Sequence, residues 1–137
     1  MSQSRPGVYF QVMMAAKDYE TIDRLSPAFL AYIGDAVYEL YVRTCYLLPP
    51  RKVGVYHNQV VAQVRAETQA KALQKLTPLL TTVEQDIVRR GRNAATGCPR
   101  RLKPEIYQQA TSLETLIGYL YLRDTERLSE LLNILIT

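Results

Sequence analysis

The sequence predicts an all-α fold, and three kinds of observation support that expectation. Apolar residues recur three and four positions apart in successive segments between residues 27 and 136. Residues that favour helix starts, such as Ser26 followed by Pro27, precede some of these segments. Prolines, including Pro49, Pro50 and Pro78, stand where the helical pattern stops.

The first predicted helix begins at Pro27, with Ser26 as its capping residue, and ends before Pro49. It would contain about 20 residues. Its apolar positions share one side of a helix and are expected to face the core. They are Leu30, Ile33, Val37, Leu40 and Tyr41.

Four further helices are expected downstream. A second helix is predicted from about Tyr56 to Leu76, with Val60, Val64 and Leu73 as its core residues. Thr81 and Glu84 have the spacing of a capping box, which would open a short third helix that ends near Arg90. A loop over residues 91–103 follows. The last two helices are predicted over residues 106–122 and 125–136.

Length and composition favour one folded domain in a reducing compartment. A chain of 137 residues with 47% hydrophobic and 22% charged residues is long enough for a single core. Residues 1–24 lack clear periodicity and are interpreted as an extension of unknown role, so the domain would span residues 25–137. No apolar run reaches the roughly 18 to 20 residues that a membrane span needs. Without a secretory signal and with only Cys45 and Cys98 as thiols, the expected location is the cytoplasm.

Two acidic residues stand on helix faces that carry small neighbours. Asp35 shares its side of the first helix with Ala28 and Ala31. Glu114 lies within about one turn of Ala110, Thr111 and Gly118 on the 106–122 helix. Such clearings leave room for a hydrated metal ion and a phosphate group. Pattern alone favours two ordinary surface acids, since exposed carboxylates are common.

Two segments resemble the signature helices of the ribonuclease III nuclease domain. Residues 30–39, LAYIGDAVYE, are similar to the first acidic helix, and residues 110–122, ATSLETLIGYLYL, are similar to the second. The resemblance covers roughly residues 25–136 and includes the RRGRNA run at residues 89–94. The Mini-III subclass, which lacks a separate double-stranded-RNA-binding domain, gives the best match to this short chain. It implies a compact helical endonuclease domain that forms a dimer.

The resemblance assigns roles to individual residues. The metal-binding aspartate and glutamate of the family fall on Asp35 and Glu114, so both are expected to be catalytic and to bind Mg²⁺, for which Mn²⁺ can substitute. Larger family members carry three further acids, where this chain has Ala28, Ala31 and Thr111. The family implies hydrolysis of double-stranded or stem-structured RNA by a homodimer, with large-subunit ribosomal RNA precursor as the expected substrate. Mini-III members are similarly reduced, so the missing acids agree with that subclass.

The densest positive segment of the sequence precedes the second acidic helix. No acidic residue interrupts it before Glu105, and the net charge of +4 suits a polyanionic partner. A solvated surface loop is the alternative for the charge run, and turn chemistry is the alternative for Asn93. The expected RNA-binding residues are Arg89, Arg90, Arg92, Asn93, Arg100, Arg101 and Lys103.

Other candidate sites receive less support from the residues. Glu39 could be an outer carboxylate of the metal site, but an ion pair with Arg43 four residues later is favoured. His57 is the only histidine, so a zinc site or a serine triad is not expected, and a Cys98–His57 pair lacks an orienting group. Two other functions stay open: a non-catalytic RNA-binding or ribosome-assembly module, and a purely structural dimerisation domain.

Overall fold

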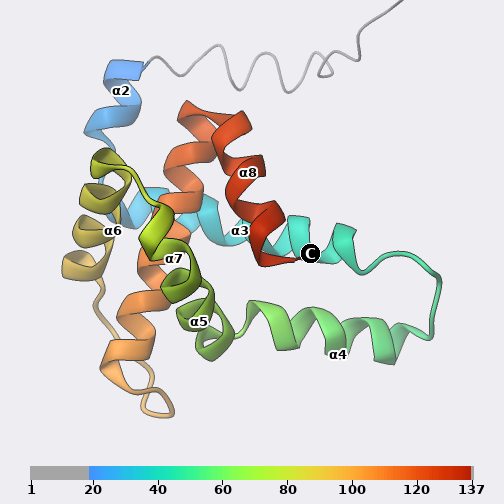
Figure 1. Cartoon of the computed structure of the whole chain (residues 1–137). Coiled ribbons are helices and arrows are strands. Elements are labelled where there is room, and N and C mark those ends of the chain that lie inside the picture. Colours follow the sequence, from blue (N-terminus) through green and yellow to red (C-terminus); the bar gives the residue numbers. More distant parts are fainter. Residues whose placement is uncertain (1–18, 137) are drawn as a thin grey trace, which may run out of the picture.

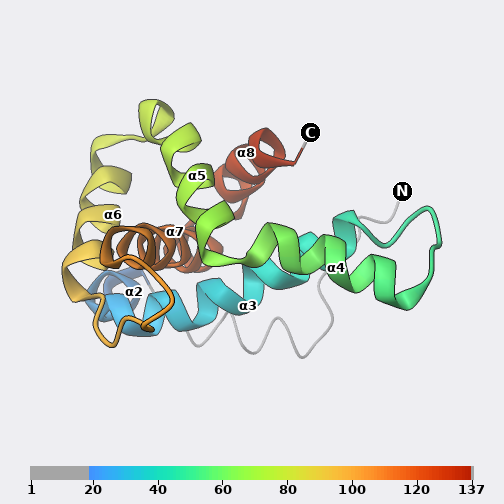
Figure 2. The same cartoon turned by 90° about the horizontal axis from the view of Figure 1, so that it is seen from below.

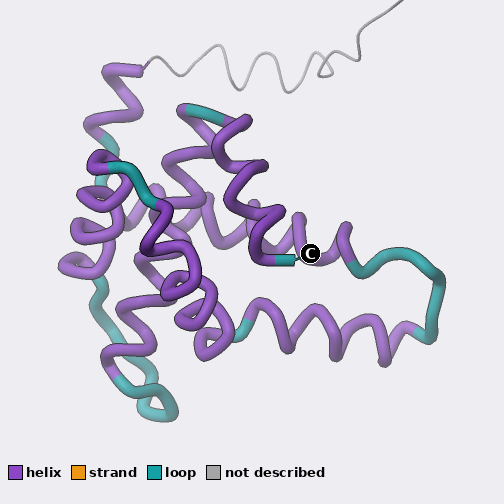
Figure 3. Tube along the Cα trace, viewed as in Figure 1, coloured by secondary structure: helices purple, strands orange, loops and turns teal. Residues whose placement is uncertain are grey.

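The computed structural model describes residues 19–136, and every regular element in that range is a helix (Figures 1 and 3). The all-α prediction is therefore confirmed. In chain order the elements are α2 (Tyr19–Arg24), α3 (Pro27–Cys45), α4 (Val53–Val64), α5 (Ala66–Leu76), the 3₁₀ turn η1 (Thr77–Leu79), α6 (Thr82–Ala94), α7 (Pro104–Arg123) and α8 (Thr125–Leu135).

Helix α7 forms the centre of the domain. Figure 2 looks along its axis and shows α3, α5 and α6 around it, while α4 extends away from this group. Its residues 115 to 120 are all buried, because neighbouring helices cover it from several sides. Side chains from most other helices, including Leu30, Leu73, Ile87 and Leu131, pack against it in one core.

Two glycines let α3 and α7 cross with their backbones in contact. A Cβ atom built on Gly34 would lie 1.8 Å from the carbonyl oxygen of Glu114, and one built on Gly118 would lie 1.9 Å from that of Leu30. No other residue type fits at such a distance, because real Cβ contacts begin beyond about 3 Å. The crossing fixes the middle of α3 against the middle of α7, where the two acidic residues lie.

Helix α3 starts as predicted but ends earlier and faces the core differently. Ser26 Oγ accepts a hydrogen bond from the Phe29 amide at 3.4 Å, and the helix ends at Cys45. Leu40 was expected in the core but is 65% exposed, whereas Tyr38 is buried. The buried residues of α3 follow one another at intervals of four positions, so they lie to one side of the apolar stripe that the sequence suggested. They are Leu30, Gly34, Tyr38 and Val42.

The expected helix over residues 56–76 is two helices, α4 and α5. Arg65 between them has an extended ψ of 152°, which turns the chain. The break also changes the hydrogen bonding: the Thr68 amide donates to the Arg65 carbonyl at 3.1 Å instead of to Val64 four residues before it. The uninterrupted prediction was wrong because Arg65 and Ala66 are good helix formers and no glycine or proline marks the turn.

Helix α6 starts at the predicted capping box and runs further than expected. The Thr81 amide donates to Glu84 Oε1 at 2.9 Å, and the Glu84 amide donates to Thr81 Oγ1 at 3.2 Å, which confirms the box. The helix ends at Ala94, not near Arg90. Gly91 stands inside it as a packing residue, since a Cβ there would lie 2.5 Å from Thr115 Oγ1 on α7.

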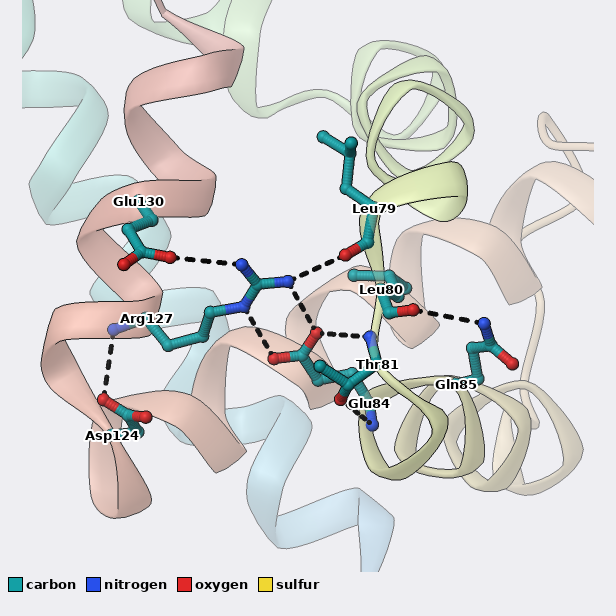
Figure 4. Close-up of polar contacts among 8 residues, drawn as sticks. All are labelled: Leu79, Leu80, Thr81, Glu84, Gln85, Asp124, Arg127 and Glu130. Carbon is teal, nitrogen blue, oxygen red and sulfur yellow. Dashed lines mark hydrogen bonds and ion pairs between the residues drawn. The ribbon is translucent and has the colours of Figure 1, made fainter.

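A buried ion pair joins the start of α6 to α8 (Figure 4). Arg127 Nε donates to Glu84 Oε2 at 2.9 Å, and its Nη2 donates to the Leu79 carbonyl at 2.8 Å. The Glu84 carboxylate therefore accepts hydrogen bonds from both the Thr81 amide of the capping box and the Arg127 guanidinium. Arg127 and the Thr81 amide hold the pKa of Glu84 below its ordinary value, although burial opposes them. Through these hydrogen bonds Arg127 links α8 to Glu84 on α6 and to the Leu79 carbonyl.

The described fold begins within the segment that the sequence analysis treated as an extension. Residues 19–24 form α2, and Ile22 is only 1% exposed in the core. The Arg123 guanidinium also lies 3.7 Å from the centre of the Tyr19 ring. Residues 1–18 of the expected extension lie outside the described residues.

Candidate active site

The crossing of α3 and α7 brings Asp35 and Glu114 together. Asp35 follows Gly34 directly, and Gly34 touches the backbone of Glu114, so the two acidic residues lie at the same point of the crossing. Their carboxyl groups share a side-chain hydrogen bond. The structure thus places the two predicted site residues in one pair, although they are about 80 residues apart in the sequence.

A cavity of about 300 Å³ opens beside the two carboxyl groups. Its wall consists mostly of small side chains, so a phosphate group and hydrated ion have room to enter. Of the expected clearing, Ala28, Ala31 and Thr111 line the cavity, whereas Ala110 is buried in the core and Gly118 packs on α3. The other lining residues are Pro27, Tyr32, Gly91, Ala94, Ala95, Thr96 and Tyr107.

The two carboxyl groups strongly affect each other's chemistry. Burial, with a hydrogen bond to Asp35 and its charge, raises the pKa of Glu114 to about 8, while a hydrogen bond from Gln69 acts in the opposite direction. At neutral pH without a cation, the Glu114 carboxyl group therefore keeps its proton. A bound divalent cation would replace that proton and neutralise both charges. Two converging carboxylates with an open cavity fit Mg²⁺, which needs few protein oxygens and keeps several waters.

The raised pKa predicts a pH-dependent stability difference in metal-free protein. The unfolded carboxyl ionises near its ordinary value of 4.5, whereas the folded one stays protonated to about 8, so rising pH favours unfolding across this window. Glu114→Gln removes the effect. We expect the variant's advantage in free energy of unfolding to grow by about 2 kcal/mol between pH 5 and pH 9, because the open cavity screens part of the shift. Denaturant unfolding with chelator measures it, and a difference that does not change with pH would contradict it.

Among the described residues, no three His, Cys, Asp or Glu side chains form a cluster that could hold a metal. Glu39, the possible third carboxylate, instead accepts a hydrogen bond from Arg43 at 3.2 Å, as the favoured alternative predicted. Two carboxylates are thus the acidic groups that line the cavity. A cation there would depend on water and substrate oxygens for the rest of its shell.

The expected RNA-binding residues divide between a helix and a connection. Arg89, Arg90, Arg92 and Asn93 lie on α6, and two of them, Arg92 and Asn93, were expected in the loop. Arg100, Arg101 and Lys103 lie in the segment between α6 and α7. The cavity lies at the junction of these two groups, since Gly91, Ala94 and Thr96 line it. Tyr107 Oη donates to the Thr96 carbonyl at 2.8 Å and so ties the connection to α7.

The basic side chains differ in how available they are. Arg89 pairs with Asp86, and Arg90 lines a neighbouring pocket that also contains Asp23. The exposed Arg92 and Arg100 form no ion pair with any residue of the described part of the chain. Arg101 is exposed and forms no ion pair there either, but its charge lowers the pKa of Glu67. Arg92 and Arg100 therefore present the least compensated charge among the arginines of this region.

Sequence reasoning missed one polar residue of the site. Gln69 on α5 is 4% exposed and its side chain forms a hydrogen bond with the Glu114 carboxyl group. It lay within the single helix expected over residues 56–76 and had no distinguishing pattern. Only the break at Arg65 and the packing of α5 on α7 bring it to the site.

Comparison with known proteins agrees with this arrangement. Residues 28–125 match the family model described as the ribonuclease III domain. The chain is 56% identical over 135 residues to a protein named Mini-ribonuclease 3 from Synechocystis sp., covering 98% of this chain and 94% of that one. A Mini-ribonuclease 3 from a Thermoanaerobacter species is 42% identical over 118 residues, covering 84% and 83%.

A solved structure shows the same fold. The X-ray structure of a protein from Fusobacterium nucleatum superimposes with a TM-score of 0.77 at 32% identity, covering 81% of this chain and 93% of that one. The residues that match the family model include both Asp35 and Glu114. The chain belongs to the ribonuclease III family and, within it, to the Mini-ribonuclease 3 group.

Proposed function

We propose that this ribonuclease is a Mg²⁺-dependent endonuclease that cuts double-stranded or stem-structured RNA, with Asp35 and Glu114 as its metal ligands. One observation carries the proposal: two carboxyl groups from crossing helices meet at the edge of an open cavity. A bound Mg²⁺ would supply charge neutralisation and an activated water. The chain's own part is to hold the two carboxylates rigidly and to leave the cavity clear for the phosphate backbone.

The substrate proposal rests on the family and on charge. A ribonuclease III family nuclease acts on RNA, and the exposed Arg92 directly follows Gly91, which lines the cavity. We propose ribosomal RNA precursor, in large-subunit maturation, as the physiological substrate and the cytoplasm as the location. None of the helices over residues 19–136 combines the length and the apolar character needed to cross a membrane.

Cleavage of a long RNA duplex tests the proposed activity. The protein is incubated with duplex in Mg²⁺, in Mn²⁺ and with chelator, and the product ends are mapped. Cleavage in either cation, none with chelator, and products with 5′-phosphate and 3′-hydroxyl ends are expected. Binding without cleavage in both cations would instead support a non-catalytic RNA-binding module.

We further propose that the active form is a symmetric dimer whose subunits meet along α3. Phe29, Tyr32, Ala36 and Leu40 follow one another at helical spacing and are exposed, with 68%, 85% and 65% of Phe29, Tyr32 and Leu40 accessible. So large an apolar stripe is typical of a contact surface. Tyr32 also lines the cavity, so a partner on this stripe would lie beside the active site. Two sites in one dimer could cut both strands of a duplex.

Charge on this stripe should separate the subunits. Leu40→Asp places a carboxylate in the apolar contact, so we expect a monomer in analytical ultracentrifugation and nicked rather than doubly cut duplex. Val83→Asp is the matched control, because Val83 is similarly exposed at 58% but lies on α6. A Leu40→Asp protein that stays dimeric would remove this interface from consideration.

Neutralising the uncompensated arginines should weaken RNA binding and its salt dependence. Arg92→Ala and Arg100→Ala are each expected to lower the slope of log affinity against log salt by up to about one unit, if each contacts one phosphate. Arg89→Ala should have a smaller effect, because Asp86 already compensates its charge. Fluorescence titrations of a catalytically inactive variant at several salt concentrations measure the slopes. If the salt dependence of binding has the same slope in all variants, the basic segment is an ordinary solvated surface and does not contact RNA phosphates.

A further inference from the structure

Gln69 is buried where a polar amide is costly. Its Nε2 donates to the Val64 carbonyl at 2.7 Å, and a hydrogen bond from the same side chain lowers the pKa of the Glu114 carboxyl group on α7. Its Oε1 is buried and accepts no hydrogen bond within the described part of the chain. An unsatisfied buried oxygen destabilises a fold, and an apolar side chain of similar volume would avoid that cost.

The break between α4 and α5 creates this arrangement. The Val64 carbonyl loses its usual partner, the Thr68 amide, because that amide donates to the Arg65 carbonyl. Gln69 Nε2 donates to the Val64 carbonyl in place of that amide, and this hydrogen bond fixes the orientation of the Gln69 side-chain amide. The Gln69 amide is thereby held on the side of α5 that packs on α7, where its hydrogen bond lowers the pKa of Glu114.

A second glutamine shows which part of this arrangement is ordinary structure. Gln85, on the first turns of α6, likewise donates Nε2 to the carbonyl five residues earlier, that of Leu80, at 3.2 Å. Gln85 is exposed and serves no carboxylate among the described residues. Bonding to a carbonyl five residues earlier therefore accounts for Gln85 fully, whereas Gln69 has an additional partner in the site.

We propose that Gln69 is a positioning residue of the catalytic centre, whose buried amide orients the Glu114 carboxylate for cation binding. The inference rests on the proposed function, since it assumes that Glu114 binds the cation. Hydrogen-bond partners of metal ligands fix the ligand's orientation, and their loss typically lowers metal affinity or activity by about 10- to 100-fold. Because Gln69 is 4% exposed, it cannot contact RNA directly.

The test compares Gln69→Met with Gln85→Met, which removes the equivalent carbonyl hydrogen bond from α6. Two quantities are measured: the rise in melting temperature on adding Mn²⁺ without RNA, and the kcat and KM for duplex cleavage as Mn²⁺ is varied. Gln69→Met should need about tenfold more Mn²⁺ for both effects, with lower kcat and unchanged KM for RNA. Gln85→Met should match the wild type. Circular dichroism verifies folding, and Gln69→Ala repeats the comparison if methionine does not fit.

The possible outcomes distinguish a failure of the proposed role of Gln69 from a failure of the proposed nuclease function. If wild type responds to Mn²⁺ and cuts RNA but Gln69→Met and Gln69→Ala respond equally, Gln69 is purely structural and the inference is overturned. Equal losses in Gln69→Met and Gln85→Met would overturn it too, because both would then reflect general destabilisation. A wild type that neither responds to Mn²⁺ nor cuts RNA would overturn the proposed function together with it.

Discussion

Asp35→Asn and Glu114→Gln should each reduce RNA cleavage at least about a thousandfold while leaving the fold intact. Both replacements keep the shape of the side chain and remove the charge that would hold a cation, which is worth several kcal/mol to the transition state. Single-turnover cleavage of a duplex in saturating Mg²⁺ measures the loss. Neither variant should unfold more easily without metal, because the new amide can keep a hydrogen bond to the remaining carboxyl group and the pair no longer has to hold a proton.

Glu39→Gln provides the matched control for these variants. Glu39 stands one turn beyond Asp35 on α3 and is engaged by Arg43 at 3.2 Å, so its removal should cost an exposed ion pair of less than about 1 kcal/mol and little activity. Full cleavage by the Asp35→Asn variant would show that Asp35 is not a required metal ligand. A loss in Glu39→Gln as large as in Asp35→Asn would show that charge on α3, and not the specific pair, matters.

The elements that local chemistry dictates were predictable from the sequence. Ser26 and Thr81 cap helices because their side-chain oxygens satisfy free amides, and both caps are present. The clearing around Asp35 was also predictable, since Ala28 and Ala31 share its helix face by spacing alone. That Asp35 and Glu114 belong to one site required the family resemblance, because nothing local links residues so far apart.

Features that depend on partners across the fold escaped prediction. Gly91 costs a helix roughly 1 kcal/mol and so suggested a loop, but its lack of a side chain lets α6 pack on Thr115. Leu40 has the apolar character of a core residue, yet it faces away from the chain's own core, and this exposure is the observation on which the proposed dimer contact rests. Periodicity identifies an apolar face but not which surface will cover it.

Gly118→Ala should be among the most damaging single-methyl additions to this chain. The new Cβ would lie 1.9 Å from the Leu30 carbonyl oxygen, and neither backbone can move aside without separating α3 from α7. We expect a loss of about 3 kcal/mol or more in free energy of unfolding, at the upper end for overpacking. Cleavage should fall even where the variant stays folded, because the same crossing sets the separation of Asp35 and Glu114.

Gly54→Ala is the matched control, since it adds the same methyl group inside helix α4, where nothing lies within 4 Å of the new atom. There the substitution should stabilise the protein by about 0.5–1 kcal/mol through reduced freedom of the unfolded chain. Denaturant unfolding of the two variants with chelator therefore gives changes of opposite sign. If Gly118→Ala were as stable and as active as Gly54→Ala, close backbone contact could not be what positions the two carboxylates, and their pairing would need another cause.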